Sequence, residues 1–284
     1  LKFLLEWTGI MRIRRGLIVQ AALPVLLLMV AAPLLAQDDV TLAGVKGLRL
    51  LDAGRFVVSG RPGTAREETF EFLQRADGGF TLLSATTMAD GSVRVQARYD
   101  YDANWKGVSG VGLGLYGDEP VRVDMRAKPG AVDIRVRGAT TAIDKTIACP
   151  DGCFMDMAPS GSPMFVMTRL YDRAKGGVQT FQWAAQDLPR PFTSPDKQRA
   201  ELRLRRELSV ERLDGSSLTI REYEMIERVP TPDGGLFVME FDLWTDAAER
   251  PIGYRINTIM GKPPAAPVVA FRRGYEDVAR QLQQ

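Results

Sequence analysis

VRVDMRAKPGAVDIRVR, residues 121–137, carries the clearest structural signal in this chain. Apolar residues alternate with charged ones over residues 121–126 and again over 132–137. A period of two places the apolar side chains on one face of a β-strand and the charged side chains on the other. Lys128-Pro129-Gly130, between the two runs, favours a tight turn. The stretch therefore predicts an antiparallel hairpin with one buried face and one face in water.

The same alternation recurs on both sides of this hairpin. It is found near residues 69–72, 93–98, 202–208 and 237–243. Further turn signals separate the runs: Asp77-Gly78-Gly79, Asp90-Gly91, Asp214-Gly215 and Asp233-Gly234-Gly235. Strands that return by such tight turns form an antiparallel meander.

The order of these signals predicts the architecture. We expect about eight strands, a helix, one strand, a Pro-rich connection over residues 186–197, and then about four strands that end near Ile259. The fold class is therefore mainly β. We predict one large curved antiparallel sheet, a half-barrel or open barrel, with one lid or plug helix and a short C-terminal helix.

One segment has a helical signal inside this β pattern. Ser162 is a suitable N-cap, Pro163 fits the first helical position, and Gly176-Gly177 provides a stop. Met164, Met167 and Tyr171 fall on one face of this helix. They either fill the core beneath the sheet or form an adaptable lid over an apolar cavity.

The N-terminal segment reads as an export signal that begins at Met11. Three arginines follow at positions 12, 14 and 15, then an apolar run over residues 17–35, and then the small residue Ala36. We interpret residues 1–10 as an over-extended start and residues 11–36 as a cleaved signal peptide, which predicts a periplasmic protein. The apolar run is also long enough for a retained membrane anchor, which is the alternative.

The remaining chain divides into a body and a tail. We predict a single antiparallel β domain over residues 37–262 and a Pro-rich tail with a short helix over residues 263–284. Residues 1–36 hold four basic residues and one acidic residue, so their removal changes the formal net charge from +2 to −1. This balance gives no reason to expect nucleic-acid binding.

Several classes of enzyme are excluded by composition. The chain contains no histidine, which rules out Ser-His-Asp and Cys-His catalysis, histidine-ligated zinc and a histidine general base. It also lacks a Gly-rich phosphate loop and a nucleophile-elbow motif. We therefore expect no cofactor and no catalytic residues, and keep a carboxylate-based hydrolase or lyase as the least favoured alternative.

The two cysteines lie close together at Cys149 and Cys153. Pro150-Asp151-Gly152 between them favours a turn that brings the two sulfurs together. In an oxidising compartment this arrangement predicts a structural disulfide. A redox-active pair and a metal site are the alternatives, and the metal site lacks partner ligands.

Aromatic and methionine side chains are the candidates for lining a cavity. Tyrosine and tryptophan combine a large apolar body with a polar group, which suits the boundary of an amphiphile. The candidate ligand-binding residues are Tyr99, Tyr101, Trp105, Tyr116, Met164, Met167, Tyr171 and Trp183. The alternative is that they are ordinary core residues. The alternating glycines over residues 110–114 predict a strand that is either sharply curved or closely approached by another segment.

Several strand stretches carry a family resemblance: Arg66-Glu67-Glu68-Thr69-Phe70, Gly79-Phe80-Thr81-Leu82, Ala97-Arg98-Tyr99-Asp100, Phe241-Asp242-Leu243-Trp244-Thr245-Asp246 and Arg250-Pro251-Ile252. In these stretches and in the order of its strands, the chain resembles a group of exported bacterial half-barrel proteins. These are related to lipoprotein carriers and lipid-sensing domains and include uncharacterised periplasmic families. The resemblance implies a strongly curved sheet whose concave face holds acyl chains or another hydrophobic partner. The internal cysteine turn and the absence of a lipid-anchor cysteine depart from that group.

Three functional hypotheses follow. The first is a non-catalytic periplasmic binding protein for a lipid or another hydrophobic molecule on the concave face. The second is an envelope scaffold whose partner is a protein, and the third is the carboxylate enzyme. A continuous apolar trough would support the first hypothesis, and a filled concave face would support the second.

Overall fold

The computed structural model describes residues 47–59, 66–88, 91–116, 119–157, 160–185, 199–230, 235–264 and 267–282. All of them lie in one compact unit, residues 38–284. The predicted start and signal segments (1–10 and 11–36) and the Pro-rich connection (186–197) lie outside the described residues.

Fifteen strands form one sheet, which confirms the predicted mainly β fold with a large curved antiparallel sheet. The order across the sheet is β8-β7-β6-β5-β4-β3-β2-β1-β15-β14-β13-β12-β11-β10-β9. The strands are β1 (Arg49–Ser59), β2 (Arg66–Gln74), β3 (Phe80–Met88), β4 (Val93–Tyr101), β5 (Gly107–Tyr116), β6 (Glu119–Lys128), β7 (Ala131–Arg137), β8 (Ala142–Ala148), β9 (Phe154–Asp156), β10 (Gln179–Ala185), β11 (Arg199–Glu211), β12 (Ser217–Pro230), β13 (Leu236–Asp246), β14 (Pro251–Ile259) and β15 (Val268–Arg272). Only the pairing of β9 with β10 is parallel among these.

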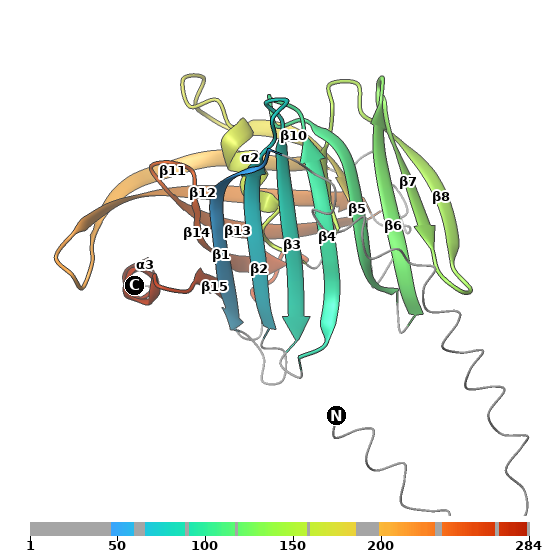
Figure 1. The fold of residues 1–284 in the computed structure, drawn as a ribbon. Helices are drawn as coiled ribbons and strands as arrows, with labels where there is room; N and C mark the ends of the chain where they lie inside the picture. Colours follow the sequence, from blue (N-terminus) through green and yellow to red (C-terminus); the bar gives the residue numbers. More distant parts are fainter. Residues whose placement is uncertain are drawn as a thin grey trace, which may run out of the picture. The chain divides into compact units, whose positions relative to one another are not determined.

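The apolar faces of the two halves of the sheet pack against each other. In Figure 1, β11–β14 pass behind β1–β5. Phe56 of β1 lies between the halves, with its ring 5.9 Å from that of Tyr254 on β14. One apolar cluster contains buried residues from β1–β4, from β6–β8 and from β9–β15. We call the face of each strand that points into this cluster the inner face, and the opposite face the outer face.

The helix α2 (Met164–Leu170) is inserted into this cluster. Residues 164–168 are buried, and the ring of Phe165 stacks on Phe56 at 5.7 Å. The arrangement favours a plug over a lid. Within the described ranges, neither helix has the length and hydropathy needed to cross a bilayer.

Two details of the predicted helix are wrong. The helix ends at Leu170, well before Gly176-Gly177, which instead lie in the following turn with positive φ. No side-chain hydrogen bond caps its start. The Ser162 hydroxyl donates to Ser84 instead, at 3.1 Å, and is therefore used between the helix and strand β3.

Strand β15 lies in the segment 263–284 that the sequence pattern presents as a tail. It pairs with β1 on one side and β14 on the other, and so joins the two halves of the sheet. Arg272 at its end contacts the Asp52 carboxylate through both Nη atoms, at 2.9 and 2.7 Å. The short helix α3 (Glu276–Leu282) follows, as predicted, and contributes Val278 to a second apolar cluster around Trp244.

The glycines of β5 mark a close approach, which is one of the two predicted alternatives. A Cβ on Gly110 would lie 3.2 Å from the Met157 methyl group, and one on Gly112 would overlap the Met157 sulfur. Just before β9, the Cys153 carbonyl accepts a hydrogen bond from Gly107 N at 3.3 Å. The segment 153–157 therefore lies directly against the inner face of β5.

Candidate binding surfaces

The predicted cavity-lining residues lie in the apolar core. Tyr99 and Tyr101 have no exposed surface, and Met164, Met167, Tyr171 and Trp183 are also buried. Trp105 is partly buried against the same cluster, and the side chain of Tyr116 lies outside the described part of the structure. A side chain that lined a ligand-sized cavity would keep accessible surface. Apart from Tyr116, these residues are therefore brought together, but as core rather than as the wall of an open trough.

Two of the tyrosine hydroxyls are used inside the protein. Tyr99 accepts a hydrogen bond from Met157 N at 2.9 Å, and Tyr171 donates to the Gly177 carbonyl at 2.7 Å. Burial raises the pKa of Tyr99 well above its ordinary value. A tyrosine that satisfies its hydroxyl within the fold supports packing rather than ligand recognition.

The cysteine pair is placed as predicted. Cys149 and Cys153 are at disulfide distance, with their Cα atoms 5.6 Å apart. Gly152 N donates to the Cys149 carbonyl at 3.1 Å, and Gly152 has a φ of +86°. The turn lies between β8 and β9, so the link fixes the point where the chain leaves the sheet edge and enters the interior.

Arg169 at the end of α2 is a feature that the sequence analysis does not single out. Its guanidinium carbon lies 4.9 Å from the centroids of both the Phe72 and the Trp105 rings. Trp105 itself stacks on Phe80 at 3.9 Å. Arg169 Nε is buried and has no hydrogen-bond acceptor among the described residues. Burial lowers the pKa of Arg169. We call Arg169, Phe72, Phe80 and Trp105 together the aromatic cage.

A buried carboxylate holds the segment that leads into α2. Glu68 on β2 is fully buried. It accepts hydrogen bonds from Ser160 Oγ (2.7 Å), Gly161 N (2.8 Å) and Ser162 N (2.6 Å). Three donors to one carboxylate compensate the cost of its burial. The arrangement is a structural attachment between strand β2 and the helix.

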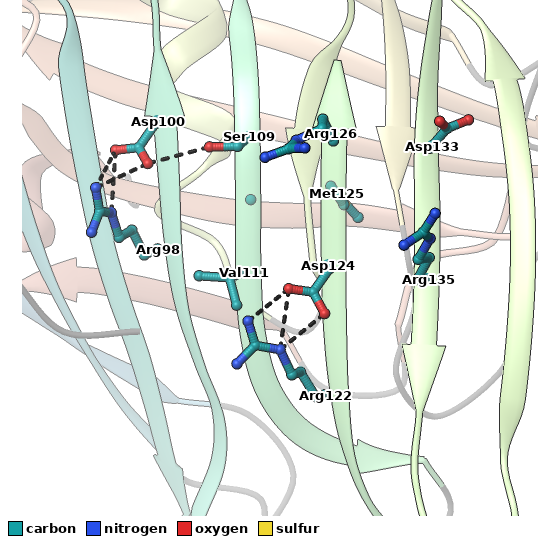
Figure 2. A pocket seen from close by; sticks show the side chains of 11 residues that line it. Arg98, Asp100, Ser109, Val111, Arg122, Asp124, Met125, Arg126, Asp133 and Arg135 are labelled. Carbon is teal, nitrogen blue, oxygen red and sulfur yellow. Dashed lines mark hydrogen bonds and ion pairs between the residues drawn. The ribbon is translucent and has the colours of Figure 1, made fainter. Parts of the chain in front are cut away.

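The outer face of β4–β7 forms a charged groove with a volume of about 640 Å³. Figure 2 shows its side chains projecting from neighbouring strands. The charged residues that line it are Arg98, Asp100, Arg122, Asp124, Arg126, Asp133 and Arg135. Ser109 and Val111 of β5 complete the lining between them. A second hollow lies on the outer face of β1–β4 and is lined by smaller residues such as Ala53, Thr69 and Ala85.

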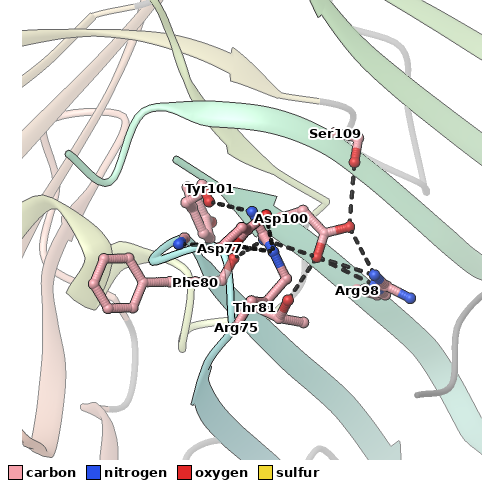
Figure 3. A network of polar contacts seen from close by, with 9 residues as sticks. Arg75, Asp77, Phe80, Thr81, Arg98, Asp100, Tyr101 and Ser109 are labelled. Atoms are coloured by element: carbon pink, nitrogen blue, oxygen red, sulfur yellow. Dashed lines mark hydrogen bonds and ion pairs between the residues drawn. The ribbon is translucent and has the colours of Figure 1, made fainter. Parts of the chain in front are cut away.

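Asp100 anchors one end of the groove. It accepts a hydrogen bond from Thr81 Oγ1 at 2.6 Å and contacts Arg98, Ser109 and Arg75 (Figure 3). Arg75 also donates to the carbonyls of Phe80 (2.6 Å) and Tyr101 (3.1 Å). The network connects the ends of β2, β3 and β4 to one another at this end of the groove.

The cations of the groove differ in how they are paired. Arg122 makes bidentate contact with Asp124, at 2.9 and 2.8 Å. Arg126 is exposed and has no ion pair or hydrogen bond among the described residues. Arg135 is 69% exposed and makes one long ion-pair contact among the described residues, with Asp144 at 3.7 Å. Asp133, which stands opposite Arg126 in the register, bonds instead to Lys128 and Thr146 at 2.6 Å each.

The outer face of the second half of the sheet is also charged, but its ions are mutually paired. Arg205 contacts Asp242 (3.2 Å) and Glu224 (3.2 Å), and Arg206 contacts Glu222 (2.9 Å). Both Asp242 and Glu222 are buried beneath these arginines. This network satisfies its own charges and is the weaker candidate for a binding surface.

Comparisons with known proteins give no function. No protein-family model matches the chain, and no curated protein sequence is significantly similar to it. Among solved structures, a beta-barrel-like protein of the domain of unknown function DUF1849 from Brucella abortus is similar, with a TM-score of 0.48 and 10% sequence identity. The match covers 78% of this chain and 97% of that chain. Among the described residues, no three or more His, Cys, Asp or Glu are grouped so that they could hold a metal ion.

Proposed function

We propose that this protein is a non-catalytic binding protein and that its partner docks on the charged groove of β4–β7. The proposal rests on the contrast between the inner face of the sheet, which is filled, and the outer face of β4–β7, which is open. The residues predicted to line a concave cavity are packed in the core. The charged groove is open; Arg126 has no ion pair among the described residues, and Arg135 has one long contact, with Asp144 at 3.7 Å.

The positions of these two cations indicate the chemistry of the partner. Arg126 stands opposite Asp133, and Arg135 stands opposite Asp124, so the two arginines are diagonal neighbours on β6 and β7. Diagonal neighbours are roughly 7–8 Å apart at their Cα atoms, which lets two long side chains reach one carboxylate. Arginine is suited to bidentate contact with carboxylates. We therefore infer an envelope protein that presents acidic side chains, in a periplasmic setting.

Site-specific cross-linking in the exporting cell tests this proposal. A photo-cross-linking residue replaces Val111 in the groove, and the control replaces Val57, which is exposed on β1. We expect a discrete cross-linked protein from position 111 and none from position 57. The combined change R126E and R135E should abolish that product while leaving the urea midpoint within experimental error. Equal products from both positions, or a product that survives the charge reversal, would refute the proposal.

The aromatic cage supports a second candidate, an amphiphile with an anionic head group. Arg169 packs over the rings of both Phe72 and Trp105 and lacks an acceptor at Nε among the described residues. An apolar chain beside the rings and an anionic head at the guanidinium would use both parts of the cage. Native mass spectrometry of protein purified from the periplasm tests this candidate. Bound lipid in the unchanged protein that is lost in Arg169→Met would support it, and a ligand-free mass in both would reject it.

A further inference from the structure

The sheet has two ends, and only one of them is covered within the described residues. At one end, β9 lies beside β5 through the Gly107–Cys153 hydrogen bond. At the other end, β8 follows β7 and no further strand pairs with it. An exposed strand edge offers unpaired backbone donors and acceptors to another strand.

The backbone groups that face outward along β8 can be identified. Cys149 N donates to the Gly130 carbonyl at 2.7 Å, on the side of β7. Because the bonding direction alternates along a strand, residues 143, 145 and 147 also bond toward β7. Residues 142, 144, 146 and 148 therefore face away from it. The Ala148 carbonyl accepts a hydrogen bond from the Gln182 side chain. The outward-facing backbone N–H and C=O groups of Ala142, Asp144 and Thr146 are therefore the ones that a partner strand could pair with.

Lys145 has its side chain on the inner face of this edge strand. It stands between Ile143 and Ile147, opposite Ile134 of β7. Its Nζ is buried and has no hydrogen-bond partner among the described residues. The inner-face neighbours on β7 are Val132, Ile134 and Val136, none of which titrates. The charged groups of the two strands, Asp133, Arg135, Arg137 and Asp144, lie on the outer face, and burial alone lowers the pKa of Lys145 to about 8.

Lys145 is the central residue of the seven in β8. In an antiparallel pairing of β8 with the β8 of a second copy over its full length, residue 145 stands opposite itself. Ile143 then stands opposite Ile147, and the outward-facing residues 144 and 146 form the hydrogen-bonded pairs. The two Lys145 side chains form a directly opposed pair of the kind without hydrogen bonds, in which side chains are closest. Like charges placed in this way are destabilising.

We propose that β8 is a strand-pairing edge for a second copy of this chain, and that the ammonium group of Lys145 keeps it unpaired at neutral pH. The symmetric contact would have a two-fold axis at residue 145. When Lys145 is neutral, the pairing places an apolar Ile–Lys–Ile row against its own copy. The inference is independent of the proposed partner on the outer face, because the edge backbone and not the groove makes the contact.

The mass in solution, measured by sedimentation or light scattering, tests the proposal at about pH 7 and about pH 9.5, on either side of a lysine pKa near 8. We expect the unchanged protein to be a monomer at the lower pH and to double its mass at the higher pH. Lys145→Met should be a dimer at both values. Lys145→Arg should be a monomer at both, because arginine keeps its charge.

A second change locates the contact. Thr146→Pro removes an outward-facing backbone donor and no backbone hydrogen bond to β7, although it also removes the Thr146 Oγ1 contact with Asp133 on the outer face. The double variant Lys145→Met with Thr146→Pro should be a monomer. Circular dichroism of each variant checks that it is folded. If the Thr146→Pro variant does not fold, Asp144→Pro replaces it, because it removes the other outward-facing backbone donor near the centre of β8. A Lys145→Met protein that remains monomeric, a dimer of Lys145→Arg at high pH, or a dimer of the unchanged protein at neutral pH would overturn the proposal.

Discussion

Glu68 is a buried carboxylate held by three hydrogen bonds. Its carboxylate accepts from Ser160, Gly161 and Ser162, and it has no contact with water. Glu68→Gln replaces one acceptor oxygen by a donor that faces donors. We expect a loss of about 1–3 kcal/mol in the free energy of unfolding, measured by urea denaturation. Glu71→Gln, on the exposed face of the same strand, is the control and should change it by less than about 0.5 kcal/mol. Equal effects of the two changes would contradict this account.

Glu227 gives the protein a pH-dependent stability. It lies on the inner face of β12 among apolar residues, and burial, followed by the charge of Asp156, raises its pKa well above the ordinary value. The folded state therefore holds a proton that the unfolded state releases. Its contribution is fully present below the unfolded pKa and is lost as pH rises through the folded pKa. Between the two values, stability falls by about 1.4 kcal/mol per pH unit.

Urea midpoints measured from pH 5 to pH 8 test this prediction. The unchanged protein should lose stability as the pH rises over this range, and Glu227→Gln should remove that part of the dependence. Glu240→Gln, on the neighbouring strand, should leave the slope as it is. A Glu227→Gln protein with the original slope would show that another group is responsible.

At the residue scale, the sequence shows which types of side chain are present but not where the fold places them. The aromatic and methionine candidates could be selected from type alone, but whether Tyr99 lines a cavity or fills the core depends on the segment 153–157 that lies over β5. Arg169 could not be found, because Phe72 and Trp105 are distant from it in sequence and meet it only through the fold. No local pattern marks a cation that is stacked between rings.

At the scale of elements, strand β5 leaves space for the segment 153–157 that packs against it. Gly112 leaves room for the Met157 sulfur, and a Cβ there would overlap it. Gly112→Ala should therefore cost about 1–3 kcal/mol of stability through overpacking. Met157→Ala creates the missing space, so the alanine at position 112 should cost far less in that background. A double-mutant cycle by urea denaturation measures this coupling, and additive effects would contradict the close approach.

The elements that could be predicted are those with local signals. Hairpins such as β6–β7 combine alternation with a turn, and Gly130 takes the positive φ that its turn requires. Strand β9 has three residues and β15 has five, both too short to establish a period. The neighbouring prolines made residues 263–284 resemble a tail. The end of α2 was misplaced because tertiary packing, rather than the glycine pair, stops the helix at Tyr171.

At the scale of the whole molecule, β15 holds the two halves of the sheet together. It is inserted between β1 and β14, which are far apart in sequence, and Arg272 fastens it to the buried Asp52. Ending the chain after Lys262 removes this strand and exposes the edges of β1 and β14. Exposed edges promote aggregation, and each half would lose the support of the other. We expect the shortened protein to aggregate or to unfold in two separate steps instead of one.

A chain that ends after Arg272 is the matched control, because it keeps β15 and removes α3 together with residues 273–275 that precede it. It should lose the packing of Val278 against the cluster around Trp244 and still unfold in a single step at a lower urea midpoint. Far-ultraviolet circular dichroism and tryptophan fluorescence, recorded together through the urea transition, distinguish the two cases. If the chain that ends at Lys262 unfolds at the same midpoint and with the same steepness as the full chain, β15 is dispensable. The sheet would then be held together by its inner-face packing alone.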